Sequence, residues 1–440
     1  MATNKQLRGC VLLAMLAVSG ALGAQTSSSK TVRHHKIAVE DQSQPPELTQ
    51  AEAAIEKKDY SAAAPLLEKV VAAQPAIYQA WFDLGFVYNA LGKAEESIAA
   101  YRQSVSAKPD VFESNLNLGL MLLKNKQPGA EEYLRAATKL KPTSQVDQGH
   151  ANAWLALAQV LEERDPKEAI EAYRQAATLQ PKDPEPYLSA GLLLEKQNKF
   201  ADAEQQYKQA LALQPSSSDA LVGLANIYLR GKRFPEAEEY LRKVVAQRPK
   251  DAIAHVQLGR VLAVEQKYDD AVAELQAGLK LAPNDPTAQR DLADIYATRG
   301  KDSDAEALYR SLLATHANDA ELHHSLGQSL LKQKKFGEGE QEFFAAVKLK
   351  PDWGAAYGDL AVAANENQNY PLTIKALDMR TKFLPEIPVG YFLRATAYDH
   401  LRKYHEAAAN YHLFLQVANG NYPDQEWQAR HRLITIEPKK

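Results

Sequence analysis

The side chains best suited to metal binding or catalysis do not form a complete motif anywhere in the sequence. Two pairs of adjacent histidines occur, His34–His35 in a polar stretch and His323–His324 further along. The dipeptide HE at 405–406 continues as AAAN, without the second histidine of a zinc-binding HExxH helix. The sequence also lacks a P-loop, a GxGxxG turn, an EF-hand loop and a CxxC pair. We therefore predict a protein without enzymatic activity, with no catalytic residues, no metal site and no cofactor.

The first 24 residues have the organisation of a secretory signal peptide. Lys5 and Arg8 precede an apolar run at 11–18, which is shorter than the roughly 20 residues of a membrane-spanning helix. The small residues of SGALGA follow, with possible cleavage after Ala21, Gly23 or Ala24. We predict an exported protein with no membrane span in its mature chain. Periplasm and external medium share this signal, so both locations stay open.

The composition limits the possible partners. The only cysteine, Cys10, lies in the signal sequence, so the mature chain is expected to have no disulfide and no thiol chemistry. A formal net charge of −3, without a basic block, gives no indication of nucleic-acid binding. Residues 25–46, which include QTSSSK, RHHK and QSQPPE, are predicted to be a disordered polar linker.

A 34-residue repeat dominates the rest of the chain. The period is seen first in prolines at fixed steps, with Ala317 in the one missing place: Pro75, Pro109, Pro142, Pro181, Pro215, Pro249, Pro283, Pro351 and Pro385. A period in this range is typical of a repeat architecture. An eight-residue insertion at 143–150, TSQVDQGH, lengthens one step, and such an inserted loop can mark a binding edge.

Small and large residues repeat in step with the prolines. A glycine or alanine recurs, usually after a leucine, as at Gly85, Gly119, Ala158, Gly191, Ala225 and Gly259. A second small residue is followed four places later by a large one, as in Ala169 with Tyr173 and Ala203 with Tyr207. Spacings of three, four and seven mark one helix face, so each unit is predicted to hold two helices. We expect the small residue to sit where the two helices cross, with a large side chain beside it.

Turn residues separate the two helices of a unit. LGK at 91–93 and RGK at 230–232 and 299–301 predict that Gly92, Gly231 and Gly300 take the left-handed conformation that closes the first helix. Asp183–Pro184 and Asp285–Pro286 predict an N-cap followed by proline in the first turn. The repeated proline ends the second helix, because the residue before it is disfavoured in helical dihedrals.

The unit around Trp81, Leu84, Gly85 and Tyr88, with Tyr101 and Pro109 on its second helix, resembles the tetratricopeptide repeat. The resemblance implies an all-α, right-handed α-solenoid of stacked antiparallel helix pairs, about eleven units over residues 47–421. The first unit is degenerate, and the tenth is weak because Thr373 and Arg380 stand where small residues are usual. His323 takes the place of Trp81 and is therefore interpreted as a packed ring.

Residues 422–440 are predicted to form a C-terminal capping helix and tail. Pro423 opens the helix, its first turn is acidic, and Arg430 and Arg432 follow, which suits the helix dipole. Trp427, His431 and Ile434 share one face. A helix of this kind would cover the exposed end of the stack.

In the family, the first helix of each pair lines a concave surface that binds peptide segments. The corresponding candidate groove residues are Phe82, Phe86, Leu116, Leu120, Leu155, Gln159, Leu188, Leu192, Asn226, Arg260, Arg290 and Asp294. The first half of this set is apolar and the second half polar, which predicts a groove in two parts. Phe82, Phe86, Leu116 and Leu120 would then form a solvent-facing apolar strip. The alternative is that these side chains contact neighbouring repeats.

These patterns indicate a non-catalytic protein–protein interaction scaffold of the bacterial cell envelope. The expected partner is a protein or peptide bound in the groove of the repeats. Two alternatives stay open. One is a carrier or sensor that holds a small ligand or glycan inside the superhelix, and the other is an accessory regulatory subunit of an envelope enzyme. The sequence does not identify the partner or the oligomeric state.

Overall fold

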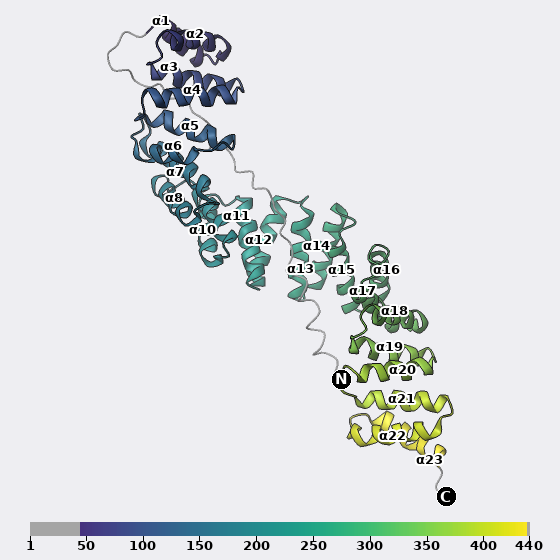
Figure 1. Ribbon diagram of the computed structural model, residues 1–440. Helices are drawn as coiled ribbons and strands as arrows, with labels where there is room; N and C mark the ends of the chain where they lie inside the picture. The colour runs from purple at the N-terminus through teal and green to yellow at the C-terminus, as the bar shows by residue number, and fades with distance from the viewer. Residues whose placement is uncertain (1–44, 438–440) are drawn as a thin grey trace. The chain divides into compact units, whose positions relative to one another are not determined.

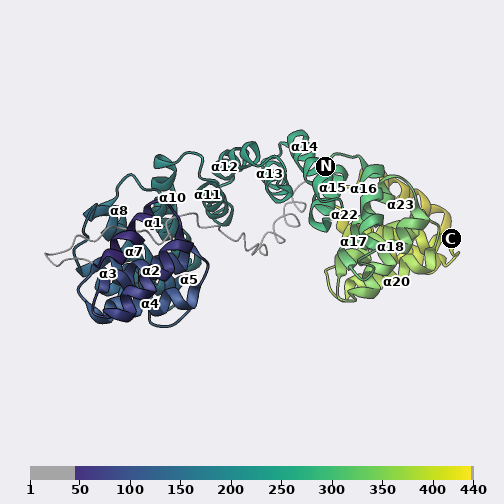
Figure 2. The ribbon, with the colours of Figure 1, turned by 90° about the horizontal axis from the view of Figure 1, so that it is seen from above.

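A computed structural model of the chain describes residues 45–437, and every regular element in this range is an α-helix (Figure 1). The helices form successive pairs, and the two helices of a pair lie side by side within their part of the chain (Figures 1 and 2). The predicted all-α fold of stacked helix pairs is confirmed. The expected signal peptide and residues 25–44 of the expected linker lie outside the described residues.

The helices divide into two compact units. Unit 1 ends at Gln247 and unit 2 begins at Arg248. Unit 1 contains α1 Pro46–Glu56, α2 Tyr60–Ala73, α3 Tyr78–Ala90, α4 Ala94–Ala107, α5 Phe112–Lys124, α6 Ala130–Lys139, α7 Val146–Leu161, α8 Pro166–Leu179, α9 Glu185–Lys196, α10 Phe200–Leu213, α11 Ser218–Arg230 and α12 Phe234–Gln247. Unit 2 contains α13 Ala252–Val264, α14 Tyr268–Leu281, α15 Pro286–Thr298, α16 Asp302–Leu313, α17 Ala320–Lys332, α18 Phe336–Leu349, α19 Gly354–Glu366, α20 Tyr370–Thr381, α21 Pro388–His400, α22 Tyr404–Ala418 and α23 Pro423–Ile436.

Small residues allow the two helices of a pair to approach closely. A Cβ atom placed on Gly85 of α3 would lie 2.8 Å from the ring of Tyr101 on α4. The same replacement at Gly191 would bring the Cβ 2.8 Å from Tyr207. Real Cβ atoms do not approach other atoms this closely, so these positions need glycine unless the neighbouring ring moves. The predicted pairing of a small residue with a large side chain at the helix crossing is confirmed.

The turn between the two helices of a pair has a left-handed residue at a constant place in every pair except α7–α8. Gly92 and Gly300 have φ values of 77° and 72°, as predicted. The prediction for Gly231 is wrong, because its φ is −76° and the next residue, Lys232, has a φ of 56°. Non-glycine residues take this conformation in most repeats: Lys58, Lys126, Asn198, Lys232, Gln266, Lys334, Gln368 and Arg402. The geometry of the turn is therefore fixed by the helices on either side and does not need glycine.

Helix ends follow the capping residues of the sequence. Asp285 accepts hydrogen bonds from the backbone N–H groups of Thr287 and Ala288, and Pro286 opens α15. Asp183 accepts from the N–H of Glu185 at 3.0 Å. At the other end, the residue before the repeated proline leaves helical dihedrals in six repeats, as Lys108 does with φ −146° and ψ 96°.

The insertion at 143–150 is docked against the preceding repeat and is largely helical, not the loop that we expected. Its second half extends α7, which starts at Val146 and runs for 16 residues. Thr143 donates from its backbone N–H and its hydroxyl to Oε1 of Glu113, at 2.8 and 2.7 Å. His150 meets the ring of Phe112 edge-on at 5.7 Å. These contacts contribute to the complete burial of the first half of α5.

The last helix, α23, packs against α22 through an unexpected face. Ala429 is fully buried, and Leu433 and Ile436 are partly buried against the α22 core. The face of Trp427, His431 and Ile434 points outward instead, with Trp427 61% and Ile434 72% exposed. Ala429, Leu433 and Ile436 are spaced four and three apart and form the narrower apolar stripe that contacts α22.

Candidate functional site

The first helices of unit 1 do not expose the apolar strip that the sequence predicts. Phe82, Leu116, Leu120 and Leu155 are 0%, 9%, 7% and 3% exposed, so the expectation that they face solvent is wrong. All four belong to one continuous core cluster that runs through several repeats. The ring of Phe82 contacts the ring of Tyr101 edge-on at 5.8 Å. Neighbouring repeats therefore bury these side chains, as in the alternative interpretation.

The remaining candidate residues of unit 1 are half-buried: Phe86, Gln159, Leu188, Leu192 and Asn226. The ring of Phe86 meets that of Tyr60, on the second helix of the preceding pair, edge-on at 5.9 Å. Oε1 of Gln159 is buried without a hydrogen-bond partner in the described part of the chain. Unit 1 thus presents partly covered side chains at these places, with one unused acceptor.

In unit 2, ion pairs join the first helices at the repeat positions that Phe82 and Phe86 occupy in unit 1. Nε of Arg260 on α13 lies 3.1 Å from Oδ2 of Asp291 on α15, without hydrogen-bond geometry. Arg290 on α15 reaches Asp319 at 3.4 Å and Glu321 on α17 at 2.8 Å. We call the pairs that link α13, α15, α17 and α19 the ion-pair ladder. It connects consecutive first helices where unit 1 has apolar contacts.

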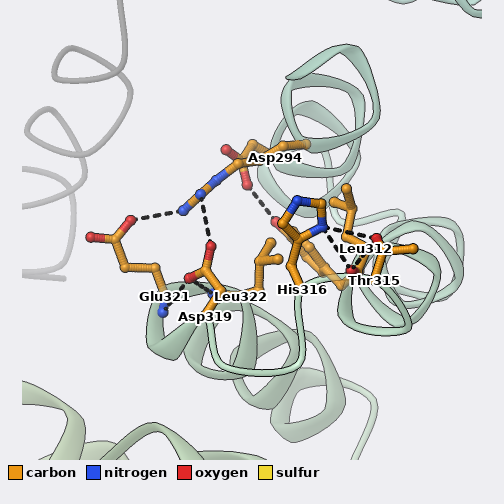
Figure 3. Close-up of polar contacts among 9 residues, drawn as sticks. Asp294, Leu312, Thr315, His316, Asp319, Glu321 and Leu322 are labelled. Carbon is orange, nitrogen blue, oxygen red and sulfur yellow. Dashed lines mark hydrogen bonds and ion pairs between the residues drawn. The ribbon is translucent and has the colours of Figure 1, made fainter. Parts of the chain in front are cut away.

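Asp319 has two roles in this ladder, and Figure 3 shows its position at the start of α17. Its Oδ1 accepts hydrogen bonds from the backbone N–H groups of Glu321 and Leu322, at 2.9 and 3.0 Å. Its Oδ2 accepts from Arg290. The cap of α17 therefore fixes the carboxylate that holds Arg290, and the orientation of Arg290 depends on the helix end.

The last step of the ladder joins α17 to α19. Nε2 of His324 lies 2.8 Å from Oδ2 of Asp359, and Gln328 donates to the same oxygen at 3.3 Å. The imidazole ring packs against Trp353 and Phe343, with ring centroids 4.5 and 5.4 Å apart. The repeat position of Phe82 in unit 1 is thus occupied in unit 2 by His324, an aromatic ring with a polar edge.

Burial changes the acidity of the carboxyl groups on α15. Burial raises the pKa of Asp291 to about 6, although the nearby Arg260 acts in the opposite direction. Burial also raises the pKa of Asp294, which accepts a hydrogen bond from the hydroxyl of Tyr309 at 2.6 Å (Figure 3). Asp291 is therefore expected to change charge at a higher pH than an ordinary aspartate.

A recurring hydrogen bond at the repeat boundary was not predicted. Trp81 donates to the carbonyl oxygen of Pro75, six residues earlier, at 2.9 Å. The same bond is made by Asn115 to Pro109, by His255 to Pro249, by Gln289 to Pro283 and by His323 to Ala317. The constant spacing of six is visible in the sequence, but four different side-chain types hide it. His323 is therefore a boundary donor with a structural role.

Two kinds of feature are absent from the part of the chain that the structure describes. Within 45–437, no group of three or more histidine, cysteine, aspartate or glutamate residues could hold a metal ion. In the same range, no helix is both long enough and apolar enough to cross a membrane.

Comparison with known proteins gives family matches and structural similarities. A family model described as the cilia and flagella-associated protein 70 C-terminal domain matches residues 30–290, and a tetratricopeptide repeat model matches residues 262–329. No curated protein matches the chain.

Three solved structures are similar in fold. YrrB, described as a TPR protein with an unusual peptide-binding site, is 22% identical over 42% of this chain and 96% of its own, with a TM-score of 0.40. The C-terminal part of a TPR repeat-containing protein from Cytophaga hutchinsonii is 15% identical over 56% and 99%, with a TM-score of 0.48. The Cut9–Hcn1 assembly of the APC/C is 15% identical over 86% and 95%, with a TM-score of 0.37.

Proposed function

Because the chain belongs to the tetratricopeptide-repeat family represented by the cilia and flagella-associated protein 70 C-terminal domain, we propose that it is a non-catalytic protein–protein interaction scaffold. The observation that carries this proposal is the ion-pair ladder of unit 2. Its charged groups are paired across neighbouring first helices, and Arg290, Glu321 and Asp359 stay partly exposed to solvent.

Exposed ion pairs are suited to reversible recognition. Each contributes only about 0–1 kcal/mol to stability in water, so exchanging one partner for a charge on a bound polypeptide costs little. The fixed cap at Asp319 and the aromatic contacts of His324 hold two members of the ladder in position. We propose that a partner segment lies along the first helices of unit 2 and replaces some of these pairs.

The unit 1 members of the candidate groove have a different part in this proposal. Phe86, Leu188 and Leu192 are half-buried, so they supply limited apolar contact beside Gln159 and Asn226. The buried candidates hold these side chains in position and do not contact the partner: Phe82, Leu116, Leu120 and Leu155. Affinity for the partner therefore depends mainly on the exposed charges Arg290, Glu321 and Asp359, with Arg260 and Asp294 more deeply placed beside them.

The experiment is partner capture from envelope extracts with the full chain, followed by mass spectrometry. We expect Arg290→Glu, which reverses one charge of the ladder, to lose the protein captured by the unaltered chain. Lys280→Glu, an equal charge change at an exposed place on α14, should keep it. Equal capture by both variants would contradict a binding role of the ladder. A bound small molecule, and no bound protein, would favour the carrier alternative.

We also propose that the protein is exported to the bacterial periplasm or the external medium. The support is the signal-peptide pattern of residues 1–24. The mature chain then consists of a polar linker at 25–46, a repeat array at 47–421 and a C-terminal cap and tail at 422–440. N-terminal sequencing of the exported protein should find a start close to Gln25, and retention of Met1 would contradict export by cleavage.

A further inference from the structure

The junction between α20 and α21 departs from the repeat pattern at two core places. Arg394 takes the place before the small residue, which is leucine in eight other units: Leu84, Leu118, Leu157, Leu224, Leu258, Leu292, Leu326 and Leu360. Arg380 on α20 takes a place that is alanine in several units, such as Ala176 and Ala346. The two arginine side chains are only 11–12% exposed. Two guanidinium groups thus replace apolar core contacts.

A single buried carboxylate lies between the two arginines. Nη1 of Arg380 is 3.5 Å from Oε1 of Glu386, and Nη1 of Arg394 is 2.9 Å from its Oε2. Arg380 also donates to the carbonyl oxygen of Pro385 at 2.8 Å. Asp378, which is largely exposed, lies 3.3 Å from Nη2 of Arg394. Arg394 is therefore contacted by two carboxylates, one buried and one exposed, and Arg380 shares the buried one.

The hydrogen bonding of this cluster is incomplete. Nε of Arg394 is buried and has no hydrogen-bond partner among the described residues. Oε2 of Glu386 is also without a hydrogen bond, because its 2.9 Å contact with Arg394 lacks hydrogen-bond geometry. Buried charges with unfilled hydrogen bonds are less favourable than apolar side chains of the same volume. The cluster therefore stabilises the core less than apolar side chains at the same positions would.

The loop that carries Glu386 also exposes large apolar side chains. Phe383, Leu384 and Ile387 are 42%, 37% and 45% exposed. The ring of Phe383 stacks on that of Tyr357 at 6.3 Å, which holds the loop against α19. Exposed apolar side chains beside arginines are typical of sites where proteins bind each other.

We propose that Arg380 and Arg394 form a carboxylate-binding site for an acidic residue flanked by apolar residues in a partner polypeptide. Glu386 occupies the site in the free protein, and its own neighbours, Leu384 and Ile387, have the chemistry expected of the partner. The argument is the incomplete pairing of Arg394, since a carboxylate of the partner would supply the missing acceptor for Nε and take the place of the exposed Asp378. The site rests on the proposed scaffold function only in that its ligand is a polypeptide.

The test uses the full chain and a labelled peptide with the sequence of residues 382–388, KFLPEIP, followed by fluorescence anisotropy. The unaltered chain should bind this peptide, and Glu386→Gln should bind it at least about tenfold more tightly because the internal competitor is neutral. The peptide KFLPQIP should bind at least about tenfold more weakly to both. Arg394→Leu should abolish the difference between the two peptides. If the Glu386→Gln variant binds KFLPEIP and the unaltered chain does not, the proposal is overturned, because Glu386 would then fill the site permanently.

A second measurement separates binding from a role in stability. The triple variant Arg380→Ala, Glu386→Asn, Arg394→Leu carries residues found at the equivalent places Ala346, Asn318 and Leu360. Its Tm should equal or exceed that of the unaltered chain, with no binding of KFLPEIP. A clearly lower Tm would overturn the proposal, since the cluster would then be a structural element.

The outcome is independent of the ion-pair ladder. Arg290→Glu should leave binding of KFLPEIP unchanged, because Arg290 lies on α15 and the site is formed by α20, α21 and their loop. Loss of partner capture with intact peptide binding would support both sites, and failure of one measurement does not decide the other.

Discussion

Units 1 and 2 use the same repeat geometry and fill equivalent places with different chemistry. Phe82, Leu116 and Leu155 form a buried apolar seam between the first helices of unit 1. At the corresponding places of unit 2, Arg290 and His324 make ion pairs to the next first helix. The comparison teaches that a helix pair fixes where a side chain lies but leaves open whether it serves stability or recognition.

The energetic consequences differ because the two kinds of contact respond differently to water. Burying an apolar side chain stabilises the fold by roughly 1.5–3 kcal/mol, whereas an exposed ion pair contributes about 0–1 kcal/mol. Unit 1 therefore depends on its first-helix contacts for stability. Unit 2 can exchange its first-helix ion pairs for contacts with a partner at little cost in stability.

The largest expected effect compares Phe82 with Arg290, which occupy the same place in the repeat. Phe82→Ala should destabilise α3 and α4 by about 3–5 kcal/mol, because it removes a fully buried ring. Arg290→Ala should change the stability of α15 and α17 by no more than about 1 kcal/mol. Hydrogen exchange of the full chain measures both locally. Similar losses at the two places would remove the distinction between the units.

The pH dependence of unit 2 should reveal the buried acid of the ladder. The pKa of Asp291 is raised from its ordinary 3.8 to about 6, so the folded state holds the proton more tightly than the unfolded state. The contribution of Asp291 to stability therefore falls as pH rises from about 4 to 6, by at most about 3 kcal/mol.

The matching variant is Asp291→Asn, which cannot lose a proton. Relative to the unaltered chain, its α13 and α15 should become more stable as pH rises from 4 to 7, as measured by hydrogen exchange corrected for intrinsic rates. The helices of unit 1 serve as the internal control and should show no difference between the two proteins. A pH-independent difference would contradict the raised pKa.

The turns should behave alike in both units, which tests the shared part of the comparison. Gly92→Ala in unit 1 and Gly300→Ala in unit 2 should each cost about 1–2 kcal/mol, because both residues have positive φ. Gly231→Ala should be neutral or stabilise by up to about 1 kcal/mol, because Gly231 is right-handed. Urea unfolding of the three variants measures the effects. A loss at Gly231 equal to that at Gly92 would contradict the assigned turn register.

The smallest expected effect concerns the boundary hydrogen bond. Gln289→Leu should destabilise α15 by about 1 kcal/mol, because the bond to the carbonyl oxygen of Pro283 is lost. Gln289→Asn should lose less, since Asn115 makes the same bond to Pro109 in another repeat. Equal effects of Leu and Asn in hydrogen exchange would show that packing, not the bond, explains the place.

The local features of the repeat follow from the sequence because they depend on neighbouring residues. The crossing of Gly85 with Tyr101 is predicted from a spacing of sixteen residues within one helix pair. The caps at Asp285 and the chain breaks at the prolines are likewise set within a few residues. The error at Gly231 arose because glycine marks a turn only approximately, and Lys232 can take the left-handed conformation at modest cost.

The tertiary structure alone decided which first-helix residues face water. Phe82 and Leu116 are 34 residues apart, and their exposure depends on side chains contributed by adjacent pairs, for which period and polarity give no rule. The direction of Trp427 and the burial of Arg380 and Arg394 were decided in the same way, by packing between helices. The sequence by itself determined the helix pairs, since their signals act within one unit. The chemistry of each surface required the neighbouring units, since burial is a property of several chain segments together.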